Sequence, residues 1–526
     1  MEKQKKVLWF NNKKQLFAIS IFVLAILVHL PYLAPGGPAV KYPWPLKLVI
    51  DEGTVLYDSF RITSGEVIYR DFFQFQGPVF YYIYGGLFAI IGPTLTSARA
   101  LNLLVTALTA MLIALLIARN LGFIAGAGAA AVHACLLVPM WPYAYPHWLA
   151  ESFVFTGIYF LVTSRCRARS ELIGGVFLGL SAFTIQSIGL PILSACLAAM
   201  TVPGITKRNW KEACIRPIRV LMGASLCVSA FVFYLGMVGG LDQMGYAMFQ
   251  WVFKHYPEGQ TDIARYGYGA FVNSDIINHS RVNQPWRYFA VIGLRLVEVL
   301  PLFSVLGAIA LILQAVIKGW RQLLNNSYLL IGTASIAGVS PLLLGVTRAD
   351  LTHIAFIGSF GLCGVSILFS LLVNWKPHFR FPLTIAWAII GILTVTNLGA
   401  KTVTTYQQSR NMLDWKGEIL KQAIPRWIDD NVAPHERIVV SDMAGLQYLY
   451  IRRSAVGFTF IPVNAPKYYS DEQWRKIGEQ ILKSLPLVIE LNEKQWLQVT
   501  QWTPALAQHY QRNNRLLLRV GFTPHK

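Results

Sequence analysis

Apolar blocks of about twenty residues dominate this sequence, and that is the length an α-helix needs to cross the hydrocarbon core of a bilayer. Hydrophobic residues make up 54% of the 526 residues and charged residues only 14%, about half the charged share of an ordinary soluble protein. A long helical core in a soluble protein is the alternative, but so many blocks of this length cannot pack into one soluble domain. The sequence therefore predicts an all-α polytopic membrane protein.

The positions of the basic residues indicate the membrane topology of the chain. A net charge of +20 would suggest nucleic acid in a soluble protein, but here much of the Lys and Arg lies in short segments between apolar blocks, as the positive-inside bias produces. We therefore expect no nucleic-acid partner, a cytoplasmic N-terminus, and about eleven transmembrane helices. The expected helices cover 15–34, 98–117, 123–140, 148–163, two within 171–202 broken near 189–191, 218–238, 289–317, 328–346, 354–373 and 381–400.

The composition changes after Lys401. Residues 1–400 are predicted to form the transmembrane domain, with external loops at 36–97 and 239–287. Residues 401–526 are polar, rich in Trp and without a spanning segment, which predicts a small α/β domain on the extracytoplasmic face. Within it we expect a helix over 410–431 and short strands over 437–441 and 487–490.

The first external loop carries the most informative residues. Asp51 and Glu52 lie in the loop that follows the first predicted helix. Two adjacent carboxylates are costly to hold near hydrocarbon, so a functional site is the default interpretation at such a position. A solvated loop that happens to be acidic is the alternative. The rest of the loop contains Arg61, Ser64-Gly65-Glu66, Arg70-Asp71, Gln76-Gly77-Pro78 and Tyr81-Tyr82.

This ordered set resembles the first external loop of the GT-C superfamily of polytopic glycosyltransferases. The similarity is greatest to the branch of protein O-mannosyltransferases, the lipid A aminoarabinose transferase and bacterial lipopolysaccharide galacturonosyltransferases. Members carry an Asp-Glu pair after the first helix, then a Ser-Gly-acid turn, then a Gly/Lys-Pro turn that leads into aromatic residues. Arg99, at the start of the second predicted helix, also fits their pattern. The resemblance covers about residues 15–200, and the remainder only by topology.

The resemblance implies a transferase of the bacterial inner membrane that makes cell-envelope glycans or lipopolysaccharide. Its donor would be a polyprenyl-phosphate sugar and its acceptor a hydroxyl of a glycan, lipid or protein. Asp51 would deprotonate that hydroxyl, with Glu52 beside it in the site and the anomeric configuration inverted. Tyr57 and Tyr81, in the same loop, are predicted to bind substrate. The aminoarabinose transferase has Arg shortly after Asp-Glu and Lys before the later Pro. Thr54 and Gln76 or Gly77 stand here instead, so we expect phosphate to be bound differently.

A leaving phosphate needs cations or hydrogen-bond donors fixed where its negative charge grows. The strongest candidates are Arg348 and His353, in a turn between two predicted helices, with Asp350 placed to orient a cation or bind sugar. Anchoring at the membrane interface is the alternative for this turn. Arg61 and Arg70 are secondary phosphate candidates. An ion pair with Glu66 or Asp71 is the alternative for each of them.

His147 and Glu151 lie four residues apart at the start of a predicted helix and so face the same way. They could bind a sugar hydroxyl or a divalent cation, the one cofactor the sequence brings into consideration. A hydrogen-bonded pair is the alternative, since one His and one Glu do not make a metal site. Aromatic and charged residues fill 250–287, which predicts either a lid over the site or an interfacial platform that contacts membrane lipids.

Three other functions compete with a transferase. A transporter or flippase would be expected to show paired repeats and charges along a path through the membrane, and the sequence has no internal repeat. A polysaccharide ligase or polymerase would keep its catalytic residues in a late loop, without the Asp-Glu pair in the first. A receptor would bind through the C-terminal domain, where no residue pattern marks a site.

Overall fold

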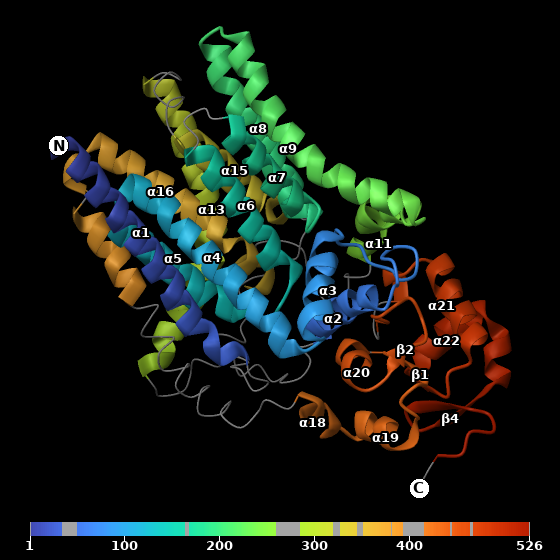
Figure 1. Cartoon of the computed structure of the whole chain (residues 1–526). Coiled ribbons are helices and arrows are strands. Elements are labelled where there is room, and N and C mark those ends of the chain that lie inside the picture. Colours follow the sequence, from blue (N-terminus) through green and yellow to red (C-terminus); the bar gives the residue numbers. More distant parts are fainter. Residues whose placement is uncertain are drawn as a thin grey trace.

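The computed structural model of the chain has a long helical bundle with a smaller domain at one end (Figure 1). The described residues are 2–33, 50–163, 168–258, 285–318, 327–344, 351–379, 381–392, 415–441, 444–462 and 466–524.

The bundle helices that are labelled in Figure 1 follow the predicted apolar blocks. They are α1 Glu2–His29, α4 Leu95–Leu121, α5 Phe123–Val132, α6 Pro146–Thr163, α7 Ala168–Ala182, α8 Gln186–Thr206, α9 Trp210–Met237, α13 Pro285–Lys318, α15 Ser327–Leu343 and α16 Leu351–Trp375. Among the described residues, seven helical segments are long and apolar enough to cross a membrane. The chain is a multi-pass membrane protein, while the predicted count of about eleven spans is not confirmed.

The break between α7 and α8 differs from the prediction. It lies at 183–185 rather than near 189–191, and Pro191 is inside α8. The carbonyl groups of Phe183 and Thr184 accept hydrogen bonds from the backbone N–H groups of Val79 and Gly77. Because backbone N–H groups of the first loop donate hydrogen bonds to these carbonyl groups, α7 can end there without leaving buried acceptors unsatisfied.

The described part of the first predicted loop is largely helical, a feature that the sequence analysis did not predict around Asp51. Helix α2 spans Ile50–Thr63 and α3 spans Val79–Ile91. Two carboxylates in the first turn of α2 favour the positive end of the helix dipole, and Val55 and Leu56 give the helix a buried apolar side. The loop is therefore a scaffold that holds its polar side chains at fixed positions.

The C-terminal domain has a five-stranded sheet with short helices around it, as predicted. The strand order is β2-β1-β3-β5-β4, parallel between β1 and its neighbours and antiparallel among β3, β5 and β4. The two predicted strands are present, whereas the described part of the predicted helix over 410–431 forms two helices. The elements are β1 Arg437–Val440, β2 Arg453–Ser454, β3 Val488–Glu490, β4 Tyr510–Asn513, β5 Leu516–Arg519, α18 Trp415–Leu420, α19 Ala423–Asn431, α20 Ala444–Tyr450, α21 Asp471–Ser484 and α22 Glu493–Trp502.

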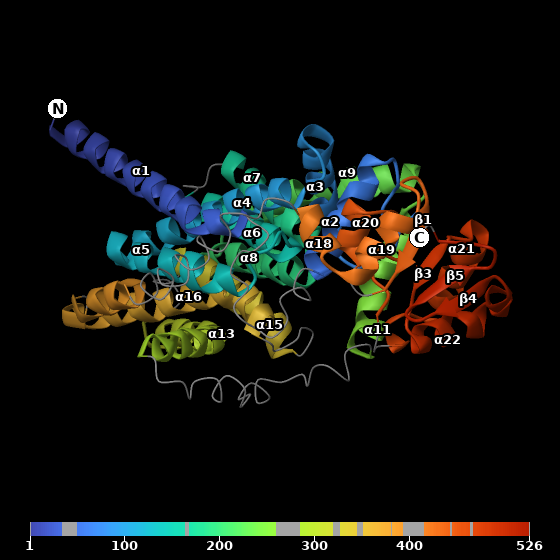
Figure 2. The ribbon, with the colours of Figure 1, turned by 90° about the horizontal axis from the view of Figure 1, so that it is seen from below.

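Helices α2 and α3 lie where the bundle meets the C-terminal domain, and the N-terminus of α1 lies at the opposite end in both views (Figures 1 and 2). The segment that follows α9 also reaches this junction. It consists of α10 Leu241–Gly245, a π-helical turn Tyr246–Trp251 and α11 Val252–Glu258. Trp251 is fully buried and packs against Phe73 of the first loop and Tyr468 of the C-terminal domain. The remainder of the predicted lid, and the boundary near residue 400, lie outside the described residues.

Candidate functional site

Asp51 and Glu52 are adjacent in sequence but have opposite environments. Successive residues of a helix point about 100° apart, so the first turn of α2 directs one side chain outward and the other inward. Asp51 is exposed, whereas Glu52 is fully buried. Of the two, Asp51 is therefore the carboxylate that a dissolved or membrane-borne substrate can reach.

Glu52 is held in a buried ion pair. Its carboxylate accepts hydrogen bonds from Nη2 and Nε of Arg99, at 2.6 and 3.0 Å, and from the backbone N–H of Ala144 at 2.9 Å. Arg99 also donates to the carbonyl of Tyr32, just after α1, at 3.1 Å. Removing one partner of such a buried pair costs about 3–5 kcal/mol, because the other charge is left uncompensated. The pair thus joins α2 to the end of α1, the start of α4 and the turn before α6.

Tyr468 of the C-terminal domain lies among several phenols and interacts electrostatically with Asp51. Burial raises the pKa of the Tyr468 phenol well above its usual value, and the neighbouring Tyr469, Tyr256, Tyr145 and the charge of Asp51 raise it further. Tyr468 thus connects Asp51 electrostatically to a group of phenols contributed by the C-terminal domain, α11 and the turn before α6.

Tyr145 connects this group of phenols to two predicted site residues, His147 and His353. Its ring stacks on His147 with centroids 5.2 Å apart, and His147 stacks on Phe356 at 4.3 Å. The ring of His353, near the start of α16, lies 6.2 Å from that of His147. The structure thus brings His147 and His353 together, although about two hundred residues separate them. Arg348 and Asp350 lie outside the described residues, and their roles stay predictions.

Arg61 and Arg70 both have acidic partners. Arg61 is buried, pairs with Glu66 at 2.5 Å and donates to the carbonyl of Val456 at 3.1 Å. Arg70 is exposed and binds Asp71 with two hydrogen bonds, of 2.9 and 2.7 Å. These are the ion pairs that the sequence offered as alternatives to phosphate binding.

The hydroxyl groups of the two predicted substrate-binding tyrosines of the loop form hydrogen bonds within the protein. The Tyr57 hydroxyl accepts from the backbone N–H of Ser454 at 2.8 Å, and the Tyr81 hydroxyl donates to the side-chain oxygen of Gln76 at 2.8 Å. Both rings are buried. They form part of the support around α2, and substrate contact by either one stays a prediction.

Glu151 is fully buried one turn after His147. Its carboxylate lies 3.9 Å from Nδ1 of His133, which shares a 2.8 Å hydrogen bond with the hydroxyl of Ser359. Within the described part of the chain, no three His, Cys, Asp or Glu side chains are grouped so as to hold a metal ion. One His and one Glu do not suffice to hold a divalent cation.

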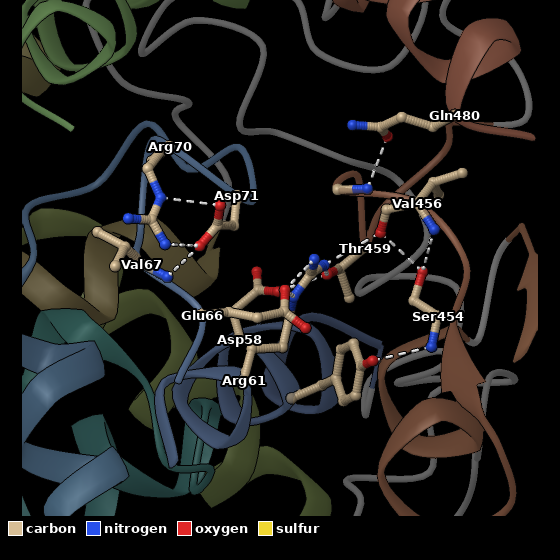
Figure 3. A network of polar contacts seen from close by, with 12 residues as sticks. Asp58, Arg61, Glu66, Val67, Arg70, Asp71, Ser454, Val456, Thr459 and Gln480 are labelled. Atoms are coloured by element: carbon tan, nitrogen blue, oxygen red, sulfur yellow. Dashed lines mark hydrogen bonds and ion pairs between the residues drawn. The ribbon is translucent and has the colours of Figure 1, made fainter. Parts of the chain in front are cut away.

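A second set of residues was missed from the sequence. Asp58 is fully buried in α2, and its carboxylate accepts a hydrogen bond from the hydroxyl of Thr459 (Figure 3). It accepts another from Gln74 at 2.6 Å. Burial raises its pKa from 3.8 to about 6, against the opposing charge of Arg61. The one signal in the sequence is spacing, since Asp58 lies seven residues after Asp51 and hence on the same face of a helix.

Comparison with known proteins identifies the fold. No protein-family model matches the sequence, and no curated protein matches it. Among solved structures, ArnT from Cupriavidus metallidurans bound to undecaprenyl phosphate matches with a TM-score of 0.53 and 13% identity, over 97% of this chain and 99% of that one. The oligosaccharyltransferase AglB of Archaeoglobus fulgidus, in complex with an inhibitory peptide and a dolichol-phosphate, matches at a TM-score of 0.47 and 13% identity, over 94% of this chain and 72% of that one. The likeness to ArnT confirms the predicted GT-C fold.

Proposed function

We propose that this protein is a membrane glycosyltransferase that moves a sugar from a polyprenyl-phosphate donor to an acceptor hydroxyl, with Asp51 as the general base. The observation that carries the proposal is the exposed Asp51 in the first turn of α2, at the junction of bundle and C-terminal domain, in a chain with the fold of ArnT. That solved structure holds undecaprenyl phosphate, which supports a lipid-phosphate donor for this chain as well.

The chemistry requires one base and one stabilised leaving group. The Asp51 carboxylate takes the proton of the acceptor hydroxyl as its oxygen attacks the anomeric carbon. The bond between that carbon and the phosphate oxygen breaks, and its electron pair leaves with the lipid phosphate. In-line displacement inverts the anomeric configuration and needs no covalent intermediate. A positioned base of this kind contributes about 10²- to 10⁴-fold in rate.

The leaving phosphate would be held by His353 and Arg348. His353 lies at the same end of the bundle as His147 and Tyr145, and Arg348 precedes it by five residues. A guanidinium group can bind two phosphate oxygens at once. The buried ion pair of Glu52 with Arg99 would fix the start of α2.

The orientation follows from the same proposal. The basic segments at the N-terminus and between helices favour a cytoplasmic N-terminus. The C-terminal domain and α2, at the other end of the bundle (Figures 1 and 2), would then lie on the extracytoplasmic side of a bacterial inner membrane. Nucleotide sugars are absent there, which agrees with a lipid-linked donor.

The test is transfer by purified protein from polyprenyl-phosphate sugars to candidate acceptors, with Asp51→Asn beside wild type. We expect kcat to fall about 10²- to 10⁴-fold in Asp51→Asn with little change in KM. Asp471→Asn is the matched control because Asp471 is also an exposed acid in the first turn of a helix, in α21. Transfer by Asp51→Asn at the wild-type rate would refute the base assignment, and a wild-type protein that consumes no polyprenyl-linked sugar would refute the transferase.

A further inference from the structure

We propose that the C-terminal domain positions the general base: Thr459 acts through Asp58 to fix α2, and so sets where Asp51 stands. The inference rests on the proposed function and deepens it, because it gives the soluble domain a role in the reaction. Thr459 and Asp58 are positioning residues in this proposal, and neither is assigned contact with substrate.

Helix α2 presents one continuous stripe to the C-terminal domain. Tyr57, Asp58 and Arg61 all point toward it, and Figure 3 shows Asp58 and Arg61 directed at Thr459 and Val456. Asp51 lies seven residues before Asp58, which is two helical turns and nearly the same angular position. A shift of this stripe therefore moves Asp51 in the same direction.

The polar contacts along the stripe are buried and specific. The Asp58 carboxylate accepts from the Thr459 hydroxyl and from Gln74, and the Arg61 guanidinium donates to the Val456 carbonyl at 3.1 Å. Ser454 donates its backbone N–H to the Tyr57 hydroxyl at 2.8 Å. A buried carboxylate that loses a partner leaves a desolvated acceptor, which is more costly than the loss of an exposed contact. The docked arrangement is thus strongly favoured over small displacements.

The backbones of α2 and α20 also meet without side chains between them. A Cβ built on Gly445 would lie 2.1 Å from the backbone of Gly53, and one built on Gly53 would lie 2.8 Å from Leu446. Gly53 is two residues from Asp51. Direct contact at this point leaves no room for the first turn of α2 to move toward the domain.

Glu52 holds the other side of the same turn. Its ion pair with Arg99 joins α2 to the transmembrane helices, while the stripe joins α2 to the C-terminal domain. Asp51 therefore stands on a helix fixed from two sides by parts of the chain that are far apart in sequence. Rates of positioned reactions are sensitive to such placement, since a displacement of about 1 Å can cost about a hundredfold.

The test compares three threonine variants in the transfer assay. Thr459→Val removes the donor to Asp58 at nearly constant volume, and we expect kcat to fall about 10- to 100-fold with an unchanged KM for the donor. Thr459→Ser keeps the hydroxyl and should restore most of kcat. Thr503→Val is the control, because Thr503 is a buried threonine of the same domain whose hydroxyl has no hydrogen-bond partner among the described residues.

The outcomes separate this inference from the proposed function. If wild type transfers sugar and Asp51→Asn does not, but Thr459→Val keeps a kcat within about twofold of wild type, the positioning role is overturned. An equal loss of kcat in Thr503→Val, or a loss in Thr459→Val that Thr459→Ser fails to restore, would also overturn it. If wild type transfers nothing, the proposed function itself fails.

Discussion

The buried Asp58 should make the docking of α2 on the C-terminal domain dependent on pH, and Asp58→Asn should remove that dependence. Burial raises the pKa of this carboxyl from 3.8 to about 6. Since one pKa unit corresponds to about 1.4 kcal/mol, keeping Asp58 ionised in the docked state costs about 3 kcal/mol. Ionisable groups around it come from α2, the turn after it, α3 and the C-terminal domain; they are Arg61, Glu66, Tyr81 and Tyr469.

The direction of this pH dependence follows from the raised pKa of Asp58 in the docked protein. The docked protein holds the Asp58 proton more tightly than an opened chain in which the carboxyl has its ordinary pKa. The stability that this proton provides is complete below about pH 4 and is lost as the pH rises through about 6. Asparagine is a neutral amide of nearly the same shape, so Asp58→Asn should show no such loss between pH 4 and 7.

Hydrogen exchange of the α2 amides, corrected for the intrinsic pH dependence, measures the free energy of opening. Relative to Asp58→Asn, wild type should lose up to about 3 kcal/mol across this range. Asp71→Asn is the control, because the contribution of Asp71 to stability should change with pH in the opposite direction. Partial burial acts to raise the pKa of Asp71, but hydrogen bonds from Arg70 and Val67 outweigh it and hold that pKa below its usual range. Identical pH profiles for wild type and Asp58→Asn would refute the reasoning.

Two further substitutions test the supports of α2. Glu52→Gln leaves Arg99 buried without its carboxylate and should lower stability by about 3–5 kcal/mol, seen as a lower Tm; an unchanged Tm would show that the ion pair is not the anchor. Gly445→Ala places a methyl group against the α2 backbone and should cost about 1–3 kcal/mol, whereas Gly86→Ala, with nothing within 4 Å of its Cβ among the described residues, should leave Tm near that of wild type. A Tm loss of the same size in Gly86→Ala would contradict the packing argument.

The sequence predicted those parts of the fold that depend on local patterns. Apolar length located most of the bundle helices, and runs of β-branched residues located β1 and β3. The break after α7 was misplaced because it depends on Gly77 and Val79, about one hundred residues away, which bind the free carbonyls. The helix around Asp51 was missed because its apolar side is short and its partners lie in other segments.

Long-range contacts also limited how much of the candidate site could be predicted from the sequence. Adjacency suggested that Asp51 and Glu52 act together, but their angular separation on α2 and the distant Arg99 give Glu52 a buried anchoring position. Asp58 carried no signal beyond its spacing, since Thr459 is about four hundred residues away. Arg61 contacts Glu66 and the carbonyl of Val456 through its guanidinium group, and Val456 lies about four hundred residues away in the sequence.

The proposed reaction needs one base, and the two carboxylates that begin α2 show what a second acid adds to it. A base that must accept a proton needs access to substrate, and access leaves a side chain without the packing that would fix it. Glu52 supplies that fixation from the next position along the helix, because its buried ion pair with Arg99 immobilises the backbone that carries Asp51. Exchanging the two roles would require a rotation of α2 by about 100°, which the contacts of Tyr57, Asp58 and Gly53 with the C-terminal domain oppose. The C-terminal domain and the ion pair therefore both hold α2 in the orientation that leaves Asp51, and not Glu52, accessible.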